Sequence, residues 1–161
     1  MDQIHLHLII NHLPIIGTIL ACLVLAHGLF TKSTQTKIAA YNLLILSAAG
    51  AVAAYLTGEG AEDTVEKIQG ISKEAIEEHG EFAKFAMIAL IVTGVVALAA
   101  LIFTLRKSSL TITLAIVTLV LALISFGLMA RTGYQGGQIR HTELGTSTPN
   151  AAQGAETKDD D

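Results

Sequence analysis

"FAKFAMIALIVTGVVALAALIFTL", residues 82–105, decides the fold of this protein, because Lys84 is the single charged residue in it. A helix that rises 1.5 Å per residue needs about 20 apolar residues to cross roughly 30 Å of hydrocarbon. Three more apolar runs of this kind occupy residues 4–30, 38–57 and 110–130. The sequence therefore predicts an integral membrane protein of the all-α class, folded as an antiparallel four-helix bundle.

The composition agrees with this class. Hydrophobic residues make up 52% of the chain and charged residues 15%, and the mean hydropathy is +0.57, whereas soluble domains carry about 25% charged residues. Residues 1–144 are predicted to form the transmembrane domain, and the acidic segment 145–161, which lacks apolar periodicity, a disordered tail. The net charge of −4 argues against a nucleic-acid partner. No nucleophile elbow, phosphate loop or H-E-x-x-H motif supports hydrolase or transferase chemistry.

The basic residues between the apolar runs predict the orientation. Lys32 and Lys37 lie between the first two runs, and Arg106 and Lys107 lie between the last two. An even number of spans places both short connections on one side of the membrane, which the positive-inside rule makes cytoplasmic. We therefore expect both termini and the long second connection on the opposite, periplasmic side.

The long connection predicts helical structure of its own. Asp63 followed by Glu66 resembles a helix N-terminus, and Gly70 a stop, so a short amphipathic helix is expected between the second and third spans. Ser72 is a second capping residue, after which apolar residues recur at helical spacing. The third span is thus expected to begin about two turns before its apolar core, which places His79 on a helix just above the hydrocarbon.

The distribution of the six histidines is the main functional clue. The predicted topology puts five of them at one membrane face and His27 near the other; the five are His5, His7, His12, His79 and His141. Ionisable groups at membrane depth are costly unless they meet partners inside a bundle. His7 and His12 are about 140° apart around a helix, so they point in different directions. Pro14 predicts a kink or a helix start near residues 11–13, which we expect to aim His12 into the bundle.

Three glycines follow the last apolar run. Gly133, Gly136 and Gly137 are expected to end the fourth helix and to let the chain turn back over the mouth of the bundle. That turn would bring Arg131, Arg140 and His141 over the end that holds the other histidines.

These two stretches resemble a known family. "HLIINHLPI" (residues 7–15) is similar to an H-P-x-x-V-H-F-P-I opening, and "GYQGGQIRH" (133–141) to a G-H-x-G-G-x-L-T-H close. Both motifs belong to a bacterial family of small four-helix membrane proteins of unknown function, some fused to cytochrome c-type domains. The resemblance spans nearly all of residues 5–143 and implies a multi-pass protein of the bacterial inner membrane. It places the family histidines on His7, His12, His141 and, at the start of the third helix, His79.

Two positions depart from the family pattern. Leu8 replaces the proline of the opening motif, and Tyr134 replaces the histidine after the first glycine of the close. The second change leaves a ligand role at that position without support.

Histidines from different helices at one end of a bundle suit a b-type haem, because two axial imidazoles approach opposite faces of a flat ring. We expect one or two haems, serving electron transfer. The expected ligands are His7, His12, His79 and His141; Arg131 and Arg140 would pair the propionates, and Leu13, Phe82, Phe85 and Phe126 would form apolar walls. Glu78, Glu81 or Gln135 would accept the second ring N–H of a ligand.

Two alternatives come from other classes. A copper or zinc site would use His5, His7, His79 and His141 with acidic side chains. The other alternative is a cofactor-free accessory subunit of a respiratory membrane complex. We expect an electron-transfer protein or subunit rather than a stand-alone enzyme, in the lipid bilayer, with a cytochrome c, a respiratory complex or a second copy of the chain as partner.

Overall fold

The computed structural model describes residues 3–65 and 73–140, which form five α-helices. These are α1 (Gln3–Ile10), α2 (His12–Phe30), α3 (Thr34–Val65), α4 (Lys73–Leu105) and α5 (Thr111–Arg140). Four stretches are long and apolar enough to cross a membrane: His5–Phe30, Thr34–Ala61, Lys73–Leu105 and Thr111–Gln138. The first of them combines most of α1 with α2. The predicted all-α membrane bundle of four spans is therefore confirmed.

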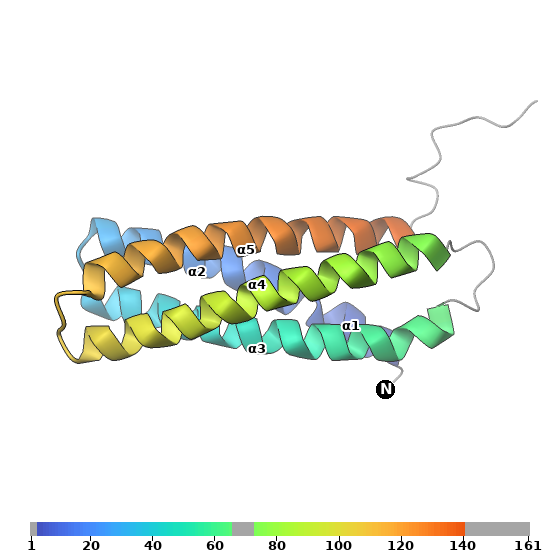
Figure 1. The fold of residues 1–161 in the computed structure, drawn as a ribbon, viewed down its shortest axis with the longest axis horizontal. Coiled ribbons are helices and arrows are strands. Elements are labelled where there is room, and N and C mark those ends of the chain that lie inside the picture. The colour runs from blue at the N-terminus through green and yellow to red at the C-terminus, as the bar shows by residue number, and fades with distance from the viewer. Residues whose placement is uncertain (1–2, 66–72, 141–161) are drawn as a thin grey trace, which may run out of the picture.

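The helices run up and down in sequence order (Figure 1). Each long helix packs against the next, and α5 returns to pack against α2, which closes the bundle. The short helix α1 packs mainly against α3. The α2–α3 and α4–α5 turns lie at one end of the bundle, and α1 and the first residues of α4 lie toward the other (Figure 1).

The first span is interrupted where the sequence predicts it. Residue Asn11 separates α1 from α2, and Pro14 follows in the first turn of α2. Proline lacks a backbone N–H and crowds the carbonyl four residues earlier. The interruption is local, because Asn11 keeps helical angles and its N–H donates to the carbonyl of His7 at 2.9 Å. The side chain of Asn11 makes no cap hydrogen bond, and its Oδ1 atom is buried without a partner.

Small side chains fill the interior. Alanines on all four spans are fully buried, among them Ala21, Ala40, Ala97, Ala100, Ala115 and Ala122. At Gly94 an added Cβ would lie 2.7 Å from the Cβ of Ala48, so α3 and α4 approach too closely there for any side chain. Close contact between small residues is how transmembrane helices associate in lipid. One buried polar pair, Thr93 and Ser125, joins α4 to α5 through hydroxyl oxygens 2.9 Å apart.

The end of α3 differs from the sequence-based expectation. Helix α3 continues to Val65, so Asp63 lies inside it and does not cap a separate helix. The remainder of the expected amphipathic segment, 66–72, lies outside the described residues, as does the tail. The start of α4 at Lys73 confirms the third span's early beginning.

The expectation that the glycines end the fourth span is wrong. Helix α5 runs through Gly133, Gly136 and Gly137 to Arg140, and none of the three has a positive φ. Two of them instead admit neighbouring side chains: an added Cβ would lie 2.8 Å from Ile15 Cδ1 at Gly133 and 3.1 Å from His79 Cε1 at Gly136. Packing against the next helices thus keeps this glycine-rich stretch helical.

Candidate functional site

The structure brings two of the predicted histidines into the interior at one end of the bundle. His7 comes from α1 and His79 from α4, and both are half-buried. Each ring packs on a neighbouring helix, that of His7 on α3 and that of His79 on α5. The two imidazoles form the centre of the candidate site.

A backbone carbonyl of α3 holds the ring of His7. Its Nδ1 lies 2.9 Å from the carbonyl oxygen of Ala54 and 3.4 Å from the hydroxyl oxygen of Thr57. A carbonyl oxygen can only accept, so Nδ1–H is the donor and Nε2 keeps its lone pair. A histidine that ligates a metal through one nitrogen commonly donates the other N–H to a carbonyl in this way. His7 is therefore oriented as a ligand that would bind through Nε2.

A glycine makes room for the ring of His7. At Gly58 an added Cβ would lie 3.1 Å from Cε1 and 3.3 Å from Nδ1 of the imidazole. The sequence-based site did not include this residue. The sequence feature that could have indicated Gly58 is the stripe of small residues on α3, in which Ala54 and Gly58 are four positions apart and so lie on one face of the helix.

His79 has the same relation to α5. Its ring lies against Gly136, where an added Cβ would be 3.1 Å from Cε1, 3.6 Å from Nε2 and 3.7 Å from Nδ1. The Nδ1 atom is buried and has no hydrogen-bond partner. Each inward histidine thus packs on a glycine of a neighbouring helix, and the two glycines come from different helices.

Gln135 precedes Gly136 on α5 and contacts Glu78, the residue before His79 on α4. Its Nε2 lies 3.4 Å from Oε1 of Glu78, which fixes the amide between α4 and α5. Its Oε1 is buried without a hydrogen-bond partner, like Nδ1 of His79. A carbonyl oxygen that lacks a donor and an imidazole nitrogen that lacks a partner are complementary. The role of Gln135 as acceptor for the second ring N–H of a ligand stays a prediction, since its Oε1 and Nδ1 of His79 are not bonded to each other.

Unpartnered polar atoms concentrate at this end. Of the five buried side-chain atoms without a partner in the described residues, three belong to Asn11, His79 and Gln135. Leaving such an atom unsatisfied costs about 1–3 kcal/mol, so native structures usually supply a partner. The other two, the hydroxyls of Tyr41 and Thr104, lie on α3 and α4 toward the end with the short turns.

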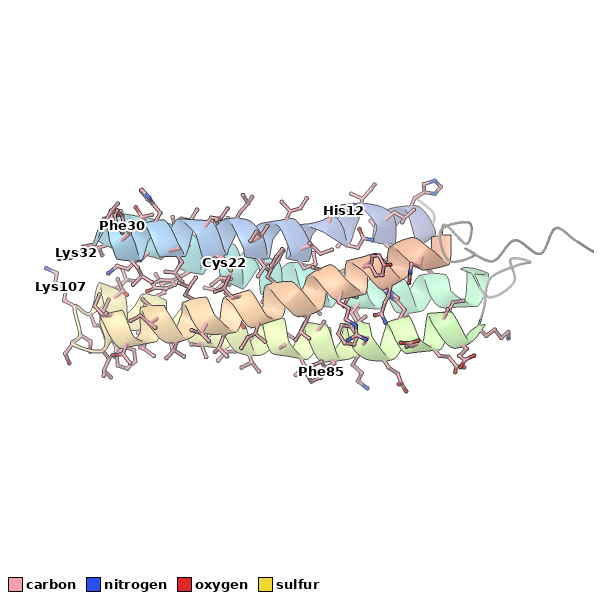
Figure 2. All side chains as sticks on the ribbon, turned by 90° about the horizontal axis from the view of Figure 1, so that it is seen from above. His12, Cys22, Phe30, Lys32, Phe85 and Lys107 are labelled. Atoms are coloured by element: carbon pink, nitrogen blue, oxygen red, sulfur yellow. The ribbon has the colours of Figure 1, made fainter. Side chains whose placement is uncertain are left out.

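The remaining predicted ligands lie elsewhere. His12 is exposed on the outside of α2, and its Nδ1 lies 2.9 Å from the carbonyl oxygen of Leu8 on the preceding turn (Figure 2). The expectation that the kink aims His12 into the bundle is therefore wrong. His5 and His27 are also exposed, and His27 lies in the last turn of α2, at the opposite end. His141 lies outside the described residues.

The structure describes the apolar residues that were predicted to surround the haem and one of the two arginines predicted to pair its propionates. Phe85 exposes 59% of its surface and faces outward, contrary to the expectation, and Phe82 and Phe126 are half-buried. Leu13 is 53% exposed but packs on α3, since a Cβ added at Gly50 would lie 2.8 Å from its Cδ2. The guanidinium carbon of Arg131 lies 4.5 Å from the centre of the Phe82 ring. This cation–π contact holds the exposed Arg131 on Phe82, which follows His79 by three residues on α4. Arg140 ends α5, and its side chain is outside the described part.

A conventional metal cage is not assembled by these residues. Within 3–65 and 73–140, no group of three or more His, Cys, Asp or Glu side chains is placed to hold a metal ion. Zinc sites use three or four protein ligands. The described residues thus supply two imidazoles from two helices.

Comparison of the chain with known proteins found no relative. No family model matches the chain, and neither a curated protein nor a solved structure matches it.

Proposed function

We propose that the protein is a membrane-bound b-type haem protein for electron transfer, in which His7 and His79 would hold the haem. The observation that carries the proposal is the pair of inward imidazoles on α1 and α4, each packed against a glycine. A haem needs only two protein ligands, because the porphyrin supplies four nitrogens itself. The described residues offer that number, whereas a zinc or copper cage needs more.

The surrounding residues fit roles around such a group. The carbonyl of Ala54 holds His7 through Nδ1, and Oε1 of Gln135, buried without a partner, would accept from Nδ1–H of His79 when the haem is bound. Hydrogen bonds of this kind fix the tautomer of a ligand and raise its basicity. Arg131, which lies on Phe82, would pair with a propionate. Haem supplies one-electron chemistry when bound, and the protein tunes it through ligand identity, hydrogen bonding and burial.

The membrane orientation of the bundle determines which redox partners could reach the two histidines. With the basic turns on the cytoplasmic side, the two histidines lie near the periplasmic face of a bacterial inner membrane, within reach of a cytochrome c or of a respiratory complex. The two sequence-based alternatives, a copper or zinc protein and a cofactor-free accessory subunit, are outcomes of the same experiment.

The test is the visible spectrum of the full chain purified in detergent, oxidised and then reduced. Six-coordinate low-spin haem is expected in the unchanged protein. His7→Ala and His79→Ala should each lose haem or the low-spin bands, because no other described imidazole faces the site. The matched controls are His12→Ala and His27→Ala, which remove exposed rings and should keep the spectrum.

Three results would overturn the proposal. A colourless protein with stoichiometric zinc or copper by elemental analysis would select the metal site. A colourless protein without metal, even after expression with added haem precursor, would select the accessory role. An unchanged low-spin spectrum in both His7→Ala and His79→Ala would refute the ligand assignment and transfer it to His12 and His141.

A further inference from the structure

Two lysines adopt a backbone conformation that L-residues rarely take. Lys32 has φ 55° and Lys107 has φ 54°, and they are the two non-glycine residues with positive φ in the described part of the chain. The Cβ atom makes the left-handed region unfavourable for every residue except glycine, and asparagine and aspartate are the next most tolerant. A lysine at such a position is therefore an outlier that calls for a physical reason.

The two lysines occupy equivalent positions in two turns. In the α4–α5 turn, the N–H of Lys107 donates to the carbonyl of Thr104 and that of Ser108 to the carbonyl of Phe103, each at 3.0 Å. This is the Schellman pattern, in which the left-handed residue after the helix is usually glycine. In the α2–α3 turn, the N–H of Lys32 donates to the carbonyl of Leu29 at 3.3 Å. Both turns thus place lysine where glycine would satisfy the backbone at a lower cost.

Both turns lie at the same end of the bundle. Figure 2 shows Lys32 and Lys107 at the end remote from His12. Both side chains are exposed, as is that of Arg106 next to Lys107. The apolar spans end at Phe30 and Leu105, two residues before Lys32 and Lys107, and lysines just beyond a span reach the headgroup region. The two ammonium groups therefore lie at headgroup depth.

No acidic residue of either turn is available to neutralise these charges. The sequence contains no Asp or Glu between Asp2 and Glu59, or between Glu81 and Glu143. The acids of the described helices gather instead at the opposite end, at Glu59 and from Glu74 to Glu81. A basic surface at headgroup depth attracts anionic lipids. Phosphate oxygens are the acceptors that match an ammonium group.

We infer that Lys32 and Lys107 bind the phosphate groups of anionic lipids in the leaflet beside the short turns, and that this binding is the reason for lysine at both left-handed positions. The inference is independent of any haem. Glycine at these positions should relieve the backbone and lose the lipid contact. Backbone strain and lipid binding then act with opposite signs on the stability of the protein.

The test uses the full chain in vesicles of phosphatidylcholine alone and of phosphatidylcholine mixed with phosphatidylglycerol. The thermal unfolding midpoint is measured by circular dichroism for the unchanged protein and for three double variants. K32G/K107G removes charge and strain, K32Q/K107Q removes charge alone, and K32R/K107R keeps both.

Phosphatidylglycerol should raise the midpoint of the unchanged protein and of the arginine pair, and the rise should shrink in high salt. In the glycine and glutamine pairs the rise should fall by at least half. In phosphatidylcholine alone, the glycine pair should unfold at a higher temperature than the unchanged protein, and the glutamine pair should not.

Equal rises in all four proteins would overturn the inference, because the charge at these positions would then be irrelevant to lipid binding. Inorganic phosphate added to phosphatidylcholine vesicles should leave the midpoint unchanged. A rise as large as that with phosphatidylglycerol would make the free anion the ligand and would overturn the lipid assignment.

Discussion

Replacing Gly136 by alanine should test whether the ring of His79 packs against α5, because the added Cβ would lie 3.1 Å from Cε1 of that ring. The adjacent Gly137 is the matched control, since an added Cβ there meets nothing within 4 Å. Replacing glycine by alanine inside a helix stabilises the helix by about 0.8–1 kcal/mol. Both positions lie in the last turns of α5, so this gain should be similar for the two variants.

The contact with His79 then sets the difference. A Cβ at Gly136 would lie 3.1 Å from Cε1 of the imidazole, which requires the ring to give by a few tenths of an ångström. Optimal carbon contacts are about 3.5–4.0 Å, and inserting an extra carbon into packed surroundings costs about 1–3 kcal/mol. For a half-buried ring, the low end applies. Gly137→Ala should therefore stabilise the protein by about 1 kcal/mol, and Gly136→Ala should leave stability nearly unchanged.

Valine should enlarge the difference, because its two methyl groups bring more carbon against the ring. We expect Gly136→Val to be less stable than Gly137→Val by about 1–3 kcal/mol. The assay is unfolding of the detergent-solubilised protein, followed by circular dichroism. In the His79→Ala background the difference between the two valine positions should disappear, as a double-mutant cycle measures.

Equal effects at the two glycines would refute this reasoning. They would mean that the ring of His79 does not lie on α5, and Gly136 would lose its connection with the candidate site. A difference that persists in the His79→Ala background would show that another group, and not the imidazole, meets the added side chain.

Three further predictions concern packing and topology. Thr93→Val should destabilise the bundle by about 0.6 kcal/mol, the average of hydrogen bonds between membrane helices, as measured by unfolding in detergent. Gly94→Ala should destabilise it by about 1–3 kcal/mol, and Ala48→Gly should recover most of that loss, because the two Cβ atoms would be 2.7 Å apart. In intact cells, a cysteine at Ser33 should resist a membrane-impermeant thiol reagent and one at Ser72 should react; the opposite pattern would reverse the orientation.

The sequence by itself determined the four spans and the break in the first. Length and apolarity decide whether a segment crosses a membrane, since every backbone polar group in lipid must be bonded within the helix. Pro14 determined the boundary between α1 and α2, because the missing N–H is a local property of the chain. The alanines and glycines of α3 and α4 favour close packing of these helices, because small side chains let two backbones approach.

The tertiary structure alone decided which histidines meet. His7 and His12 point about 140° apart on a regular helix, so only one of them can face the interior, and the rotation of α1 against α3 selects His7. That rotation depends on the sum of many small contacts, including Gly58, which lies far from His7 in the sequence. The role of the glycines in α5 likewise could not be predicted from the sequence alone. Glycine permits either a turn or a close approach, and the presence of His79 on the neighbouring helix makes Gly136 a site of close approach.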